Sequence, residues 1–214
     1  MIRENHVTIS KTARYYTLGE LTEKTKQVWI VIHGFRQTAK GFIADFEPLA
    51  NDANFFIAPE ALNRFYIDRQ GTEVVASWMT REDRLNEIKD YVNYLDTLYQ
   101  NLELGKFKGQ ITALGFSQGA STLTRWLDET QNRIDRAVVY AGEVAPELLP
   151  LKETSGLRKT HNYFICGTQD KFITAERISL AETAYAPLHF TDIFFEGKHE
   201  INVDALKGLI ETIH

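Results

Sequence analysis

Cysteine is almost absent from this chain, which has one, Cys166, among 214 residues. A single cysteine cannot form an internal disulfide and cannot supply a cysteine-based metal framework. Because Cys166 falls in a short apolar run, we interpret it as a small apolar residue of a strand. The sequence therefore excludes a disulfide scaffold and gives no sign of a cysteine-held metal centre.

Long uncharged stretches are also missing. No run approaches the roughly 18 apolar residues that a membrane helix needs. The first residues include Arg3, Glu4 and Lys11 and contain no apolar block of the length of a signal peptide. We therefore expect a cytoplasmic protein without integral membrane association.

An excess of positive charge is the third absence. The chain has 24 Lys and Arg residues against 29 Asp and Glu, a formal net charge of -5, and its basic residues are scattered. Proteins that bind nucleic acid or anionic membranes normally gather basic residues in a patch. The charge pattern thus argues against either as the main partner.

Linkers, internal repeats and low-complexity tracts are missing as well. With 43% hydrophobic and 25% charged residues, the composition is that of an ordinary globular protein. A chain of this length can bury one substantial core. We therefore expect a single α/β domain that spans residues 1–214.

Short apolar runs alternate with longer helical patterns along the chain. The expected strands cover residues 6–10, 13–17, 28–33, 54–58, 110–116, 137–141, 162–166 and 191–195, the first two as a hairpin, and the expected helices cover residues 81–102, 117–130, 175–184 and 201–213. Strand followed by helix, repeated, implies right-handed crossovers and a mostly parallel sheet with helices on both faces. The prediction is a three-layer α/β sandwich with a sheet of about eight strands.

One serine stands at the junction of an expected strand and an expected helix. Ser117 follows the run 110–116 and lies between Gly115 and Gly119. At such a junction a serine occupies a strained turn that exposes its hydroxyl above the sheet, and a Cβ at either glycine would collide with the neighbouring elements. Ligands of parallel sheets bind beyond the carboxyl ends of the strands, which is where Ser117 is expected. Ser117 is therefore a candidate nucleophile.

A serine nucleophile needs a base to take its proton and an acid to orient that base. Of the six histidines, His199 follows the last expected strand and so faces the same side of the sheet as Ser117. Asp170 lies four residues after the strand 162–166 and also suits a turn or helix cap, whereas its rival Asp192 begins a strand at the opposite end. The order Ser117, Asp170, His199 predicts a catalytic triad.

The negative charge that develops on a substrate carbonyl oxygen also needs hydrogen-bond donors in place beforehand. We expect the backbone N–H groups of Phe35 and Gln118 to form this oxyanion hole, the first on the loop after the strand 28–33 and the second at a helix start. Gly34 lets that loop turn close to the substrate. His33 is then interpreted as a brace of the loop.

These motifs resemble the α/β-hydrolase superfamily, and more narrowly its small, lid-free carboxylesterase, acyl-protein thioesterase and lysophospholipase branch. The residues that carry the resemblance are His33-Gly34-Phe35, Ser77-Trp78, Asp83-Arg84, Glu87-Ile88, Gly115-Phe116-Ser117-Gln118-Gly119, Gly167-Thr168-Gln169-Asp170 and Gly197-Lys198-His199-Glu200. The resemblance implies nucleophile, acid and base roles for Ser117, Asp170 and His199. The loop after His33 and residues 140–145 depart from the usual family sequence, so the family's acyl and leaving-group preferences do not transfer.

The expected function is hydrolysis of carboxylic esters with small or single-chain acyl groups, through an acyl-enzyme and without a metal or cofactor. A thioesterase or lysophospholipase would use the same machinery. Cofactor-free peroxidation borrows the same triad, and an inert ligand-binding homologue is a further alternative. The expected partner is a small-molecule ester or thioester, and the sequence leaves monomer and dimer open.

Because we expect no lid, other segments must form the walls of the substrate site. Only about 20 residues separate the strand ending near Ala141 from the next, which leaves room for an ordinary crossover. The longest connection, residues 59–80, carries Phe65, Tyr66, Trp78 and Met79, which either pack beneath the loop or line the site. We expect Trp78 to line the acyl pocket with Phe35, and Phe172 to border it near Asp170.

Overall fold

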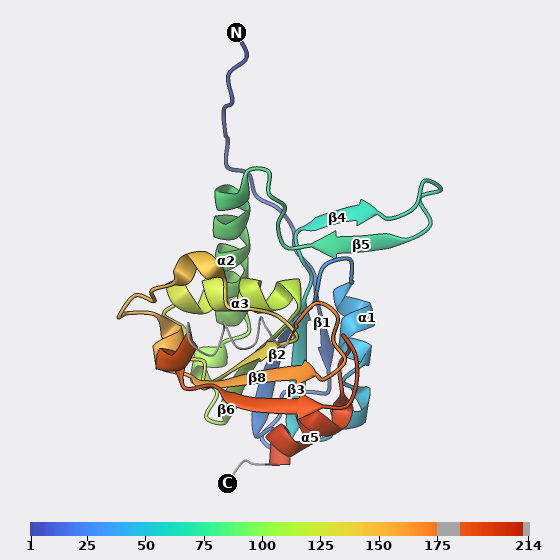
Figure 1. Cartoon of the computed structure of the whole chain (residues 1–214), viewed down its shortest axis with the longest axis vertical. Helices are drawn as coiled ribbons and strands as arrows, with labels where there is room; N and C mark the ends of the chain where they lie inside the picture. Colours follow the sequence, from blue (N-terminus) through green and yellow to red (C-terminus); the bar gives the residue numbers. More distant parts are fainter. Residues whose placement is uncertain (175–184, 212–214) are drawn as a thin grey trace.

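A mostly parallel sheet of seven strands forms the centre of the computed structural model, which describes residues 1–174 and 185–211 (Figure 1). The strand order is β1-β3-β2-β6-β7-β8-β9. The strands are β1 (Tyr15–Leu18), β2 (Gln27–Ile32), β3 (Asn54–Pro59), β6 (Gln110–Phe116), β7 (Arg136–Tyr140), β8 (His161–Gly167) and β9 (Thr191–Phe195). Only β1 runs antiparallel to its neighbour, β3.

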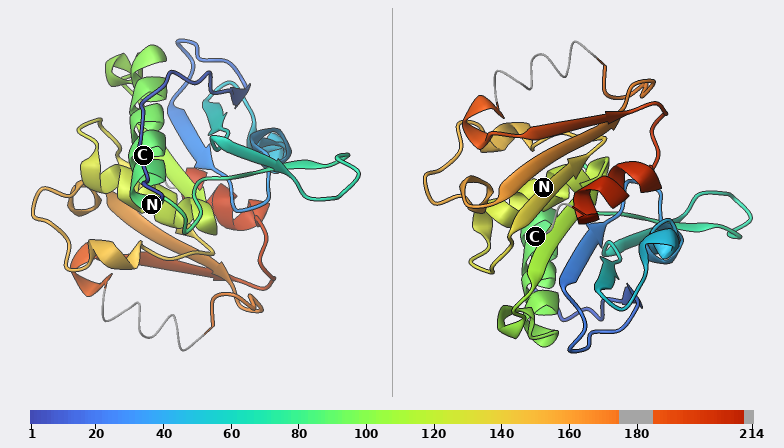
Figure 2. Two further views of the ribbon diagram at one scale, coloured as in Figure 1. Left: turned by 90° about the horizontal axis from the view of Figure 1, so that it is seen from above. Right: turned by 90° about the horizontal axis from the view of Figure 1, so that it is seen from below.

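Helices cover both faces of this sheet (Figure 2). One face packs against α2 (Arg84–Asn101) and α3 (Gln118–Glu129), and the other against α1 (Ala39–Ala44) and α5 (Val203–Glu211). Short 3-10 helices lie at Glu47–Leu49, Leu104–Lys106, Pro146–Leu148, Gly156–Arg158 and Ala186–Leu188. None of the helices in the described ranges is long and apolar enough to cross a membrane.

Strand β2 shows why the sheet must be covered on both sides. All six of its residues are buried. Side chains alternate between the two faces of a strand, so Val28 and Ile30 join the core under α2 and α3, while Trp29 and Val31 join the core under α1 and α5. A continuous apolar run therefore becomes the centre of a three-layer α/β sandwich, as predicted.

The N-terminal hairpin predicted for residues 6–10 and 13–17 is wrong. Residues 1–14 form no strand, and only β1 joins the sheet, on the outer edge of β3. Val7 and Ile9 are exposed, and in the part of the chain that the structure describes β1 is the last strand at this edge of the sheet. The main sheet consequently has seven strands, where about eight were expected.

The connection predicted for residues 59–80 contains a second, two-stranded sheet. Strands β4 (Asn63–Tyr66) and β5 (Val74–Ser77) pair antiparallel and project from the body of the molecule (Figure 1). An isolated bridge between Gln37 and Ala76 joins this hairpin to the loop after β2. No large lid stands between β7 and β8, and the helix expected at residues 175–184 lies outside the described residues.

Candidate active site

Ser117 lies on the turn between β6 and α3 with φ 54° and ψ -115°. A residue with a Cβ adopts a positive φ only when its surroundings hold it there. Its N–H donates to the carbonyl of Tyr140 in β7 at 2.9 Å, which fixes the turn to the sheet. A Cβ on Gly115 would lie 2.2 Å from the Gly119 carbonyl oxygen, so the turn requires its flanking glycines.

Asp170 and His199 meet at the carboxyl ends of β8 and β9. His199 Nδ1 lies 2.7 Å from Asp170 Oδ2. The other carboxylate oxygen accepts the N–H groups of Phe172 at 2.7 Å and Ile173 at 3.2 Å. The Asp170 side chain is fully buried and that of His199 is 21% exposed. One carboxylate therefore orients the imidazole and also holds the turn that follows it.

The ring of His199 is packed between two phenylalanines. Its centroid lies 4.8 Å from that of Phe116, which precedes Ser117, and 4.7 Å from that of Phe172. The structure thus places His199 against the turn that carries Ser117. Asp192, the rejected alternative to Asp170, pairs in register with Phe164 near the other end of the strands.

Two backbone N–H groups beside Ser117 have no acceptor among the described residues. They belong to Phe35 on the loop after β2 and to Gln118 at the first position of α3. Neighbouring groups are taken: Gly34 N–H donates to Gln37 Oε1 at 2.7 Å, and the His33 carbonyl accepts from Trp78 Nε1 at 2.8 Å. The Phe35 and Gln118 amides are the two donors proposed for the oxyanion hole from the sequence, and they remain candidates for that role.

Residues 22–203 match the family described as serine hydrolase (FSH1). The chain belongs to this serine hydrolase family. No curated protein matches the chain in sequence.

Solved structures of esterases and a thioesterase share the fold of this serine hydrolase. An acyl-protein thioesterase 2 of Zea mays is 13% identical with a TM-score of 0.69, covering 94% of this chain and 97% of its own. Esterase PE8 is 18% identical with a TM-score of 0.66 and the same coverage, and the Bacillus cereus carboxylesterase is 15% identical with a TM-score of 0.66, covering 93% of this chain and 92% of its own. The family match and this shared fold together confirm the α/β-hydrolase resemblance inferred from the motifs.

The prediction that Trp78 lines the acyl pocket does not fit its position in the serine hydrolase. Trp78 is 1% exposed and belongs to the core beneath α2. Its indole packs on the ring of His33 at 5.2 Å and on that of Tyr91. A side chain whose polar end is bonded and whose rings are covered offers a substrate almost no surface. Trp78 instead packs against His33 and so stabilises the loop after β2.

Two residues at the mouth of the site keep exposed aromatic surface. Phe35 is 51% exposed and stacks on Phe65 of β4 at 5.9 Å, and Phe172 is 63% exposed. Phe65 was part of the aromatic connection in the sequence but was not chosen over Trp78. Phe65 differs from Trp78 because it lies on the exposed face of β4. This strand was not predicted from the sequence.

The side chain of Gln118 makes contacts beside the candidate nucleophile that sequence reasoning missed. Its Oε1 accepts Trp78 N–H at 3.1 Å, and its Nε2 donates to the Met79 carbonyl at 3.0 Å. The residue after the candidate nucleophile therefore anchors the chain that leaves β5. No signal in the sequence linked residues about 40 positions apart.

His33 has the bracing role expected of it. Its Nε2 accepts Ala61 N–H at 3.1 Å and its Nδ1 lies 2.7 Å from the Gly34 carbonyl oxygen, so the neutral ring with its proton on Nδ1 satisfies both contacts. Burial lowers the pKa of His33, against smaller opposing effects of the Gly34 carbonyl and the Glu60 charge. A neutral, fully used imidazole at this position holds the loop and is no base.

One group of side chains in the described ranges could hold a metal ion. Glu4, His6 and Asp83 bring their ligand atoms within 4.8 Å of one another, all of them exposed. His6 Nε2 lies 3.2 Å from Glu4 and 3.3 Å from Asp83, distances that an ordinary surface ion pair explains. The group is separate from the residues around Ser117.

Proposed function

We propose that this serine hydrolase cleaves carboxylic esters with Ser117 as nucleophile, His199 as base and Asp170 as the acid that orients it. The observation that carries the proposal is the 2.7 Å contact of His199 Nδ1 with a fully buried Asp170. With Nδ1 bonded to the carboxylate, Nε2 is the nitrogen left to take a proton. The positive φ of Ser117 supports its part, because strain of this kind is concentrated at functional sites.

In the proposed mechanism, His199 Nε2 removes the proton of the Ser117 hydroxyl as its oxygen attacks the ester carbonyl. The carbonyl oxygen becomes an oxyanion that the N–H groups of Phe35 and Gln118 stabilise. The C–O bond to the alcohol then breaks, and the alcohol leaves with the proton from His199. Water repeats the sequence on the acyl-enzyme, which releases the carboxylic acid and restores Ser117.

The proposed substrate class rests on the exposed aromatic rings of Phe35, stacked on Phe65, and of Phe172, which we take as the walls of an open substrate site. Such walls suit a small or single-chain acyl group, since each methylene buried contributes about 0.8 kcal/mol until the chain emerges into water. Rates on nitrophenyl esters should therefore rise over a few carbons, peak at short to medium chains and then fall. A steady rise to long-chain triglycerides with activation by emulsions would contradict an open site.

Thioester hydrolysis is the second candidate, because the same groups can attack either carbonyl and the fold is shared with an acyl-protein thioesterase. Matched oxygen and sulfur esters of one acyl chain separate the two. If the thioester has the higher kcat/KM at equal chain length, the enzyme is a thioesterase.

The decisive experiment labels the protein with a fluorophosphonate and measures nitrophenyl acetate hydrolysis for wild type and Ser117→Ala. We expect labelling and turnover in the wild type, and loss of both in the variant with its melting temperature unchanged. Labelling of the alanine variant at the original rate would exclude Ser117 as the nucleophile. A wild type that the probe does not label would favour an inert ligand-binding protein.

A further inference from the structure

The side chain of Gln37 turns back on its own loop. Its Oε1 accepts the N–H of Gly34, three residues earlier, at 2.7 Å. The backbone N–H of Gln37 donates to the Gly34 carbonyl at 3.4 Å. Arg36, which lies between the two residues in the chain, has φ 63°. Both backbone groups of Gly34, the N–H and the carbonyl, are therefore bonded to Gln37, and the left-handed Arg36 makes this turn of the loop possible.

Gly34 in turn lies directly against the candidate nucleophile. A Cβ on Gly34 would meet Gln37 Oε1 at 3.0 Å, Phe116 Cδ1 at 3.1 Å and Ser117 Cβ at 3.2 Å. The next peptide along the chain carries the Phe35 N–H. A small rotation of Gly34 would consequently change where this N–H points relative to Ser117.

Gln37 is itself held from two sides. Its carbonyl accepts Ala76 N–H at 3.0 Å, and the Ala76 carbonyl accepts the N–H of Arg36 at 3.0 Å, so the residue is bonded to β5. Two positions further, Ala39 at the start of α1 donates its N–H to buried Glu60 at 3.1 Å. The backbone of Gln37 is thus fixed to neighbouring elements, so its Oε1 is a fixed acceptor for the Gly34 N–H.

The other polar groups around Gly34 are also assigned. The His33 carbonyl accepts from Trp78, and the Gly34 carbonyl faces His33 Nδ1 at 2.7 Å. With Gln37 in place, the Gly34 N–H is occupied, and the Phe35 N–H next to it has no acceptor among the described residues. Without the Gln37 oxygen, Gly34 N–H would become a second unsatisfied donor beside Ser117, free to compete for the same oxygen.

We propose that the Gln37 side chain is a positioning residue of the oxyanion hole, which holds Gly34 so that the Phe35 N–H faces the developing oxyanion. The inference rests on the proposed function. Complete loss of one oxyanion-hole donor costs about 10²–10³ in kcat. A donor that is misdirected rather than removed is expected to cost about tenfold or more. KM should stay within twofold, because the bond strengthens only as charge develops on the oxygen.

The test replaces Gln37 by methionine, which keeps the length of the side chain and removes the acceptor. Gln100→Met on the exposed side of α2 is the matched control. Nitrophenyl acetate kinetics should show kcat reduced about tenfold or more in Gln37→Met and unchanged in Gln100→Met. A trifluoromethyl ketone, which forms a tetrahedral oxyanion on the nucleophile, should lose affinity by the same factor as kcat/KM.

Three outcomes overturn the inference: kcat within twofold of wild type, a rise in KM that accounts for the whole loss, or unchanged affinity for the ketone. If Gln37→Met does not fold, Gln37→Ala is measured in its place with the same criteria. Failure of the proposed function has a different signature, since Ser117→Ala would then keep its labelling or turnover. In that case, the rates at which fluorophosphonate labels wild type and Gln37→Met still show whether Gln37 affects the reactivity of the residue that is labelled.

Discussion

The two ends of the central sheet differ in how their polar groups are used. At the carboxyl ends of the strands, Ser117 is held at a positive φ, a buried carboxylate fixes His199, and two N–H groups have no acceptor among the described residues. At the amino ends, the charged residues that line two hollows are mostly exposed. We infer from this difference that preorganised groups and unsatisfied donors distinguish the candidate site from the other end of the sheet.

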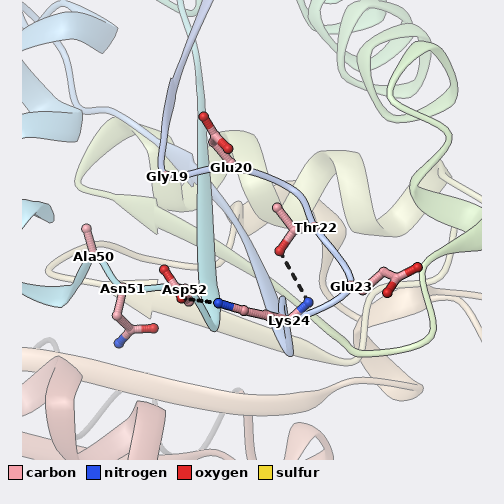
Figure 3. A pocket seen from close by; sticks show the side chains of 8 residues that line it. All are labelled: Gly19, Glu20, Thr22, Glu23, Lys24, Ala50, Asn51 and Asp52. Carbon is pink, nitrogen blue, oxygen red and sulfur yellow. Dashed lines mark hydrogen bonds and ion pairs between the residues drawn. The ribbon is translucent and has the colours of Figure 1, made fainter.

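Two hollows illustrate the amino-terminal side. One of about 690 Å³ lies between the turn before β2 and the turn before β3, where Lys24 points at Asp52, 3.0 Å away (Figure 3). The other, of about 750 Å³, includes Lys26, Lys108, Arg133 and Lys159 against the single carboxylate of Asp135. Asp135 accepts the N–H of Ile111 at 2.8 Å and so serves the start of β6. Arg133 donates to the carbonyls of Phe107 and Gly109, so it too serves the backbone around it.

Replacing Asp170 by asparagine should give the largest effect and is the sharpest test of the carboxyl end. The amide would donate to His199 Nδ1 and so leave the proton on Nε2, which prevents this nitrogen from acting as a base. We expect kcat to fall by about 10³–10⁴, as in other triads. Steady-state kinetics on nitrophenyl acetate measure the loss.

Asp192→Asn is the control for this prediction, because Asp192 belongs to β9 near its amino end. Its kcat should stay within a factor of about two. The reverse ranking of the two variants would mean that the acid has been assigned to the wrong end of the sheet.

Trp78→Phe should have the next largest effect. The change keeps an aromatic ring in the core but leaves the buried His33 carbonyl without its indole donor at 2.8 Å. An unsatisfied buried group costs about 1–3 kcal/mol, which urea unfolding would show as a lower midpoint. Because this carbonyl adjoins the oxyanion loop, kcat should also fall several-fold.

Trp126→Phe provides a matched comparison. Trp126 is fully buried in α3 and donates to Asp96 Oδ1 at 2.7 Å, in a cluster away from Ser117. It should lose a similar free energy of unfolding while kcat stays unchanged. Equal losses of kcat in both variants would show that activity follows general stability, and the contrast between the regions would lose its support.

Positions set by the strands could be predicted from the sequence, whereas the contacts of side chains in loops could not. Ser117, Asp170 and His199 could be placed on one side of the molecule because each follows a strand of the parallel sheet, and parallel strands bring their carboxyl ends to one edge. The contacts of Gln37 and Gln118 could not be predicted, since a polar side chain in a loop carries no sign of which distant backbone group it will meet. Trp78 was misplaced because a long connection predicts exposure, whereas the residue directly after β5 enters the core and packs on His33 and Tyr91.

The pH dependence of stability tests the bracing role of His33. Its folded-state pKa lies below the unfolded value of about 6.5, because burial disfavours the charged ring. The unfolded chain therefore binds the proton first, so stability is present above about pH 6.5 and is lost as pH falls towards the folded pKa, by at most about 1.4 kcal/mol per pH unit. Melting temperatures of wild type should fall over this range more steeply than those of His33→Gln. Parallel curves would assign the acid sensitivity to other groups.

The smallest effect is expected at the amino end, for Lys24→Ala. Lys24 and Asp52 are 75% and 79% exposed in their side chains, and exposed ion pairs contribute about 0–1 kcal/mol. Neither residue holds a backbone group of the sheet, so the variant should melt within about 2 °C of wild type and keep its kcat and KM. The hollow beside it (Figure 3) would then be a surface feature with no part in turnover. A loss of activity in Lys24→Ala without a loss of stability would show that this hollow communicates with Ser117, and the contrast between the two ends of the sheet would have to be abandoned.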